Sequence, residues 1–160
     1  ERMIAYRDLP RPTNWLMTKG YEMGYRLINT YFHNIKEIWG SEVAVYLPEK
    51  YAGTVDLVCV YKNQPAIVDF KQSKKPKKSE WIEDYFHQLA AYAIAHNELF
   101  KTEINFGAVL VSVQDGSTQE FTTTGYEFDN YKKAWLGRVE KFYADGGLPA
   151  PSTGSNGNKA

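Results

Sequence analysis

Two kinds of hydrophobic pattern alternate along the chain. Short apolar runs bounded by turn residues predict five β-strands, at residues 43–47, 53–61, 66–71, 105–113 and 119–124. Longer stretches with helical spacing predict three helices, from residue 13 or 14 to about 39, from 80 to about 99 and from about 128 to 144. Gly20 and Gly24 weaken the first half of the first helix and leave room for a break there.

The predicted elements follow the order helix, three strands, helix, two strands, helix. A helix between the third and fourth strands allows a crossover that joins parallel strands, whereas Asp115-Gly116 predicts a hairpin between the last two. We therefore expect an α/β fold, with a mixed central β-sheet flanked by helices, in one domain over residues 1–147. Residues 148–160 are rich in Pro, Gly and Ser, which predicts a flexible polar tail.

Charge and composition narrow the function without identifying it. The 160 residues include 19 basic and 19 acidic side chains, a balance that argues against a passive, globally basic nucleic-acid binder. The balance leaves room for an enzyme whose basic surface is local. The single cysteine, Cys59, excludes an internal disulfide and a metal site built from several cysteines. No apolar run of about 18 residues occurs, so we expect no membrane span.

Aspartates interrupt two of the predicted strands, where an uncompensated carboxylate would be costly to bury. Asp56 follows Gly53-Thr54-Val55 in one strand, and Asp69-Phe70-Lys71 ends the next. Residues two apart in a strand share a face, so Asp69 and Lys71 point the same way. If the two strands are neighbours, both aspartates can meet at one cation, and the backbone carbonyl of Phe70 is a further oxygen ligand. Such ligands suit Mg²⁺ or Mn²⁺.

This arrangement is suited to metal-dependent cleavage of a phosphodiester bond. A divalent metal polarises the phosphate and lowers the pKa of a bound water, while Lys71 orients the nucleophile and stabilises the developing charge. Glu42, on the preceding strand, is interpreted as a further metal ligand or as an anchor behind the ligands. The alternative is two unrelated aspartates at strand ends, one of them in an ordinary ion pair with Lys71.

Two further groups of side chains have both a functional and an ordinary interpretation. Gln88 and Tyr92 are four residues apart on one helix face, where they can hold a phosphate or orient Lys71; otherwise Tyr92 belongs to the core and Gln88 to the surface. A basic loop follows the second aspartate strand, and it either tracks the phosphates of DNA or is simply solvated. Its lysines are Lys74, Lys75, Lys77 and Lys78.

Taken together, these motifs resemble the PD-(D/E)XK nuclease superfamily. The closer resemblance is to its RecB-like branch, and within it to the mitochondrial genome maintenance exonuclease family and its phage relatives. The resemblance covers about residues 40 to 143 and includes the stretch from Gly107 to Gly116 and the pair Tyr131 and Trp135. The motifs that carry it are Glu42, Gly53 to Asp56, Asp69-Phe70-Lys71 and Gln88-x-x-x-Tyr92.

The resemblance implies a restriction-endonuclease-like core and a Mg²⁺- or Mn²⁺-dependent deoxyribonuclease that prefers free ends of single-stranded DNA. By the family's pattern Asp56 and Asp69 bind metal and Lys71 is catalytic, while Gln88 and Tyr92 form an additional motif at the DNA. Glu42 and Gln88 complete the expected catalytic set. The branch usually carries a metal-binding histidine on the upstream helix, where this chain offers only His33.

Two other functions remain open at this point: an endonuclease of the same fold, and a DNA-binding module that has lost catalysis. The expected location is the cytoplasm of a bacterial or phage-infected cell, or the mitochondrion if the source is eukaryotic.

Overall fold

The computed structural model describes residues 14–147, so the predicted tail at 148–160 and the predicted helix cap at Thr13 lie outside the described residues. Along the chain the elements are α2 (Trp15–Tyr31), η1 (Phe32–Asn34), β1 (Ile35–Leu47), β2 (Tyr51–Tyr61), β3 (Gln64–Ser73), η2 (Ser79–Trp81), α3 (Glu83–Phe100), β4 (Phe106–Val113), β5 (Thr118–Thr124) and α4 (Gly125–Ala144). Within these described residues, no helix has the length and apolar character needed to cross a membrane.

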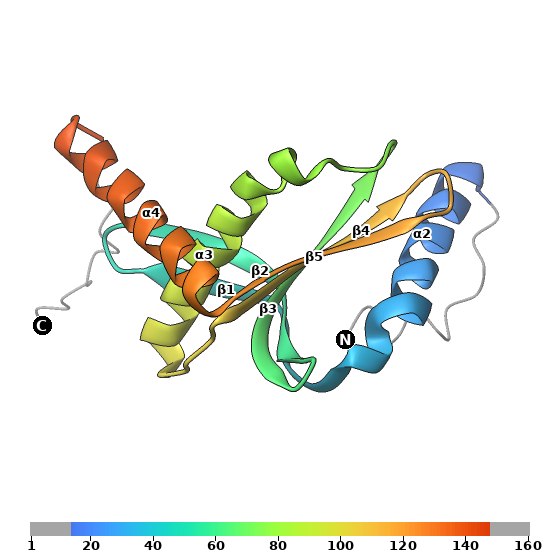
Figure 1. The fold of residues 1–160 in the computed structure, drawn as a ribbon, viewed down its shortest axis with the longest axis horizontal. Helices are drawn as coiled ribbons and strands as arrows, with labels where there is room; N and C mark the ends of the chain where they lie inside the picture. Colours follow the sequence, from blue (N-terminus) through green and yellow to red (C-terminus); the bar gives the residue numbers. More distant parts are fainter. Residues whose placement is uncertain (1–13, 148–160) are drawn as a thin grey trace, which may run out of the picture.

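The five strands form one sheet in the order β1-β2-β3-β4-β5. Only β3 and β4 are parallel, and α3 supplies the crossover between them; the other neighbours are antiparallel. This arrangement confirms the predicted α/β fold with a mixed central sheet. Figure 1 shows α3 and α4 together on one side of the strands and α2 on the other.

The prediction of the first helix was wrong at its end. The helix stops at Tyr31, and residues 35–39, which were assigned to it, instead begin β1. Ile35 and Ile38 fit a helical period, but they also pair with Tyr61 and Cys59 of β2. Pairing with a neighbouring strand therefore outweighed the local pattern. α2 is continuous through Gly20 and Gly24, so the break for which these glycines left room does not occur.

Hydrophobic residues fill both sides of the sheet. Every residue of β4 is buried, and alternate side chains serve the two layers: Val109 and Val111 pack with α3 and α4, whereas Ala108 and Leu110 pack with α2. Cys59 is fully buried in the second layer, as expected of a small hydrophobic residue. The buried sheet provides a rigid base for polar residues at its margins.

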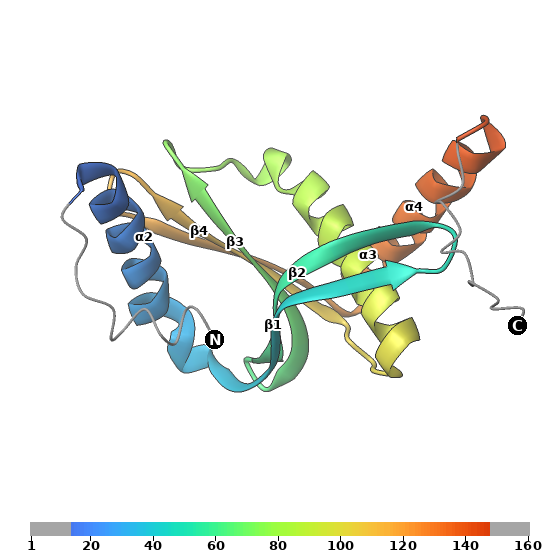
Figure 2. The same cartoon turned by 180° about the vertical axis from the view of Figure 1, so that it is seen from behind.

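The sheet forks between β2 and β3. These strands pair from Tyr61 and Gln64 only as far as Leu57 and Val68, whereas β1 and β2 remain paired to Leu47 and Tyr51. Beyond the fork β3 continues beside β4 alone. Figures 1 and 2 both show the β1–β2 hairpin running away from the ends of β3 and β4.

Candidate active site

Asp56 and Asp69 lie at this fork. Leu57 is paired with Val68, so the next residues in register are the two aspartates. The strand pairing stops here, and the backbone N–H of Phe70 donates a hydrogen bond to Asp56 Oδ2 at 3.0 Å. Like charges opposite one another destabilise a sheet, which is a physical reason for the strands to separate at this position. The predicted meeting of the two aspartates is therefore present in the structure.

Lys71 belongs to the same cluster. Its Nζ lies 2.9 Å from Asp69 Oδ2, an ion-pair distance. Within the described part of the chain, that oxygen is buried and has no partner with good hydrogen-bond geometry. Burial, and then the hydrogen bond and charge of Asp56, raise the pKa of Asp69 to about 6, although Lys71 opposes this shift. Burial disfavours the charge on Lys71, but Asp69 outweighs this effect and the pKa of Lys71 lies above its ordinary value.

The chemistry of the cluster fits a divalent cation. One ammonium group does not neutralise two adjacent carboxylates, and the poorly satisfied oxygen of Asp69 is buried beside them. The N–H of Phe70 points toward Asp56, and the carbonyl of a strand residue points to the same side as its N–H. Residues 14–147 contain no group of three or more His, Cys, Asp or Glu able to hold a metal. Two carboxylates and a carbonyl suit Mg²⁺, which keeps several of its waters.

Glu42 lies across from Asp56 on β1. The pairs on either side of it, Ser41 with Leu57 and Val43 with Val55, set this register. The backbone of Glu42 has a φ of 51°, in the left-handed region, and its side chain is exposed. Glu42 does not join the two aspartates in a three-acid cluster, so its role as a metal ligand stays a prediction.

The upstream helix brings no histidine to the described site. His33 is exposed in the short helix η1, beyond the end of α2. The part of α2 that faces Phe70 and Lys71 carries glycine and apolar residues and borders a cavity of about 280 Å³. These residues are Gly20, Met23, Gly24, Leu27 and Ile28.

Gln88 and Tyr92 contact each other, and Tyr92 also contacts the strand that carries Asp56. Gln88 Nε2 donates a hydrogen bond to Tyr92 Oη at 2.9 Å. The Tyr92 ring lies so close to Gly53 that a Cβ on this glycine would come within 2.5 Å of Tyr92 Cε1. The glycine that opens the Gly53 to Asp56 motif is therefore needed for close approach of α3. Tyr92 therefore meets β2 three residues before Asp56.

Tyr85 was not predicted as part of the site. Its ring centroid lies 5.1 Å from Lys71 Nζ, within the range of a cation–π contact. Tyr85 is one turn before Gln88 and two turns before Tyr92, so all three residues share a face of α3. This spacing was visible in the sequence, but only the packing of α3 against β3 shows that Tyr85 meets the lysine.

The basic loop after β3 is tied to the sheet by Gln119, a second residue that was not predicted. The Gln119 side chain accepts a hydrogen bond from the Lys77 N–H at 2.7 Å and donates one to the Lys77 carbonyl at 3.0 Å. Lys74, Lys75 and Lys78 are exposed, so their charges are available at the surface. The loop is thus anchored through its backbone while most of its lysines face solvent.

The fold and the fork define a class of protein. The sequence matches the model of the PD-(D/E)XK nuclease superfamily over residues 1–152, and the chain belongs to this superfamily. Nucleases of this superfamily generally use divalent metals.

Particular relatives are exonucleases by name. Mitochondrial genome maintenance exonuclease 1 of Xenopus tropicalis is 36% identical over 109 residues, which cover 63% of this chain and 30% of that protein. The Homo sapiens protein of the same name is 30% identical over 98 residues, covering 58% and 28%. The chain thus spans about 30% of the length of these relatives. A candidate exonuclease from Eubacterium rectale has a similar fold, with a TM-score of 0.51 at 14% identity over 81% of this chain and 56% of that chain.

Proposed function

We propose that residues 1–147 form a metal-dependent deoxyribonuclease domain that removes nucleotides from the ends of single-stranded DNA. The observation that carries the proposal is the fork of β2 and β3, where Asp56 and Asp69 converge with Lys71 Nζ 2.9 Å from Asp69. Membership of a nuclease superfamily supports hydrolysis of a phosphodiester bond. The names of the relatives support action on DNA ends.

Asp56, Asp69 and the carbonyl of Phe70 are the groups that would hold Mg²⁺ or Mn²⁺ at the fork. When bound, the metal supplies Lewis-acid chemistry, polarising the phosphate and lowering the pKa of a water. Glu42 lies across from Asp56 and would assist from the outer side of this set.

Lys71 acts as a cation rather than as a base. Its pKa lies above the ordinary lysine value because the carboxylates of Asp69 and Asp56 favour its charged form. Its ammonium group is held by the Asp69 carboxylate and the Tyr85 ring, so it has a fixed position beside the scissile phosphate. There it orients the attacking water and stabilises the negative charge that develops on the phosphate.

The DNA is held by groups on both sides of the fork. Gln88 and Tyr92 approach from α3, with the amide and hydroxyl joined in one hydrogen bond. The exposed lysines of the loop that follows β3 neutralise phosphates, an interaction that weakens as salt rises. These lysines are Lys74, Lys75 and Lys78, while the backbone of Lys77 anchors the loop.

The test compares three substrates: end-labelled linear single-stranded DNA, its duplex and a closed single-stranded circle, each with Mg²⁺, Mn²⁺ or a chelator. Metal-dependent loss of the linear single strand alone is the expected result. Cutting of the circle would instead identify an endonuclease, and DNA binding without cleavage in either metal would identify a binding module.

Variants connect this activity to the fork. We expect Asp69→Asn and Lys71→Met each to reduce single-turnover cleavage by about a hundredfold or more, because each removes a charge that acts in the transition state. Lys101→Met is the matched control, since Lys101 is exposed at the end of α3 and pairs only at the surface with Glu98. Equal loss of activity in the control would contradict the assignment.

A further inference from the structure

A hollow of about 410 Å³ lies next to the fork, between α3, α4 and the start of β2. Its walls include three tyrosine rings, one tryptophan ring, one side-chain amide and one guanidinium group. The residues used below are Tyr51, Tyr85, Gln88, Tyr92, Trp135 and Arg138.

The hollow adjoins the proposed catalytic residues. The Tyr85 ring borders it and also has Lys71 Nζ 5.1 Å from its centroid. Tyr92 borders it as well and packs on Gly53, three residues before Asp56. A group inside the hollow would therefore contact the same tyrosine side chain that lies against the catalytic lysine.

The walls offer both stacking surfaces and hydrogen bonds. The hydrogen bond from Gln88 Nε2 to Tyr92 Oη leaves Gln88 Oε1 as an acceptor and the Tyr92 O–H as a donor. No other partner for these two groups occurs among the described side chains and backbone. A donor and an acceptor beside aromatic faces match the edge and the faces of an unpaired nucleobase.

Arg138 adds a cation at the entrance. Its guanidinium lies 3.9 Å from Asp84, and both side chains are largely exposed, at 57% and 89%. An exposed ion pair of this kind contributes little to stability, so Arg138 is available to a phosphate at small cost. The hollow therefore combines aromatic walls with an exposed Arg138–Asp84 ion pair in its lining.

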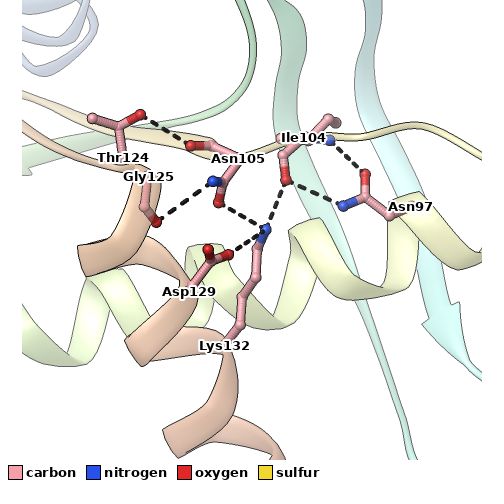
Figure 3. A network of polar contacts seen from close by, with 7 residues as sticks. All are labelled: Asn97, Ile104, Asn105, Thr124, Gly125, Asp129 and Lys132. Atoms are coloured by element: carbon pink, nitrogen blue, oxygen red, sulfur yellow. Dashed lines mark hydrogen bonds and ion pairs between the residues drawn. The ribbon is translucent and has the colours of Figure 1, made fainter.

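The far wall is held in place before any ligand binds. Figure 3 shows Lys132 of α4 reaching the loop before β4, where its Nζ donates to the Ile104 carbonyl at 2.9 Å and to Asn105 Oδ1 at 3.0 Å. Trp135, one turn further along α4, packs edge-on against Tyr51 with ring centroids 5.4 Å apart. A preformed pocket loses little freedom on binding.

We propose that this hollow binds the unpaired base of the nucleotide next to the scissile phosphate. The inference rests on the proposed nuclease function and extends it by naming the part of the substrate that is recognised. A base in a duplex is paired along its edge and stacked on its faces, so it cannot enter. The hollow thereby gives a structural origin for selection of single strands.

The test measures binding in a chelator, with an oligothymidylate strand and a fully abasic strand of equal length. The wild-type protein should bind the strand with bases more tightly, and Tyr85→Leu should reduce this ratio of affinities by about tenfold, the size of one base–aromatic stack. Because both strands carry the same phosphates, a general electrostatic change would cancel in the ratio. Tyr85→Phe, which keeps the ring, should retain the wild-type ratio.

Tyr126→Leu is the matched control, because Tyr126 is 79% exposed on α4 and does not border the hollow. Thermal unfolding of each variant verifies that the fold is intact. An equal ratio in the wild type, Tyr85→Leu and Tyr126→Leu would overturn the base pocket even if DNA is cleaved. A ratio that depends on the Tyr85 ring, in a protein that fails to cleave with either metal, would support the pocket while refuting the nuclease.

Discussion

At the scale of single residues, the central feature is a carboxylate whose charge is unfavourable in the metal-free protein. Asp69 is buried at the fork beside Asp56, and Lys71 compensates only part of this cost. Such a group is typical of a site built for a ligand rather than for stability.

A pH-dependent stability follows from Asp69. Its pKa is about 6 in the folded protein against 3.8 for the unperturbed group, so protonation stabilises the folded state, and this stability is lost as the pH rises from 3.8 to about 6. In a chelator at pH 8, Asp69→Asn should raise the free energy of unfolding by about 3 kcal/mol. The gain should disappear near pH 4, as urea unfolding at the two pH values would show; an equal gain at both would contradict this account.

Gly53 provides a second test at this scale. A methyl group at Gly53 would come within 2.5 Å of the Tyr92 ring, so Gly53→Ala should lower the free energy of unfolding by roughly 1–3 kcal/mol. Gly20→Ala is the matched control, since nothing lies within 4 Å of a Cβ there and the residue is helical. We expect the control to be slightly stabilised. Thermal denaturation measures the stability of both variants. A similar loss of stability in Gly20→Ala and Gly53→Ala would show that the contact of Gly53 with the Tyr92 ring is not the cause.

At the scale of elements, the sequence predicted most where local pattern and tertiary structure agree. In the strand that contains Asp69 and Lys71, the local pattern and the tertiary structure agree. The two-residue spacing correctly placed these two side chains together. The end of the first helix failed because Ile35 and Ile38 fit two periodicities, and pairing with β2 decided between them. Tyr85 and Gln119 escaped prediction because their partners, Lys71 and Lys77, are far away in the sequence or on another element.

Gln119 holds the basic loop through two hydrogen bonds to the backbone of Lys77. Gln119→Leu removes both hydrogen bonds to the Lys77 backbone while keeping much of the side-chain volume. We expect several-fold weaker binding of single-stranded DNA and a smaller dependence of affinity on salt, because a loosened loop neutralises fewer phosphates. Binding titrations at several salt concentrations measure this, with Thr122→Leu, an exposed change on the same strand, as control. An unchanged salt dependence would show that the loop lysines do not contact DNA.

At the scale of the whole molecule, the two helices on one face are joined through the loop between α3 and β4. Lys132 contacts that loop from α4, and Asn97 of α3 contacts it from the other side through both the N–H and the carbonyl of Ile104. Figure 3 shows these contacts meeting at one point. The Ile104 carbonyl is thus a shared acceptor for side chains of α3 and α4.

Lys132→Met tests the connection. The substitution keeps a long apolar chain but leaves Asn105 Oδ1 without the donor that Lys132 supplies. We expect a loss of about 1–3 kcal/mol in the free energy of unfolding and faster hydrogen exchange at the start of α4. Lys133→Met, at an exposed position on the same helix, should change neither quantity. Equal exchange in both variants would show that α4 is held by its apolar contacts alone.

The fork also places the wall of the hollow and the aspartate pair on the same short segment of β2. Tyr51, at the wall of the hollow, and Asp56, at the aspartate pair, lie five residues apart on β2, in the segment that pairs with β1 but not with β3. A displacement of this hairpin alters both places together. By thermodynamic reciprocity, whatever factor a bound strand adds to the affinity for metal, the metal must add to the affinity for the strand. We therefore expect binding of a single strand to change the affinity for Mn²⁺, and binding of Mn²⁺ to change the affinity for the strand by the same factor.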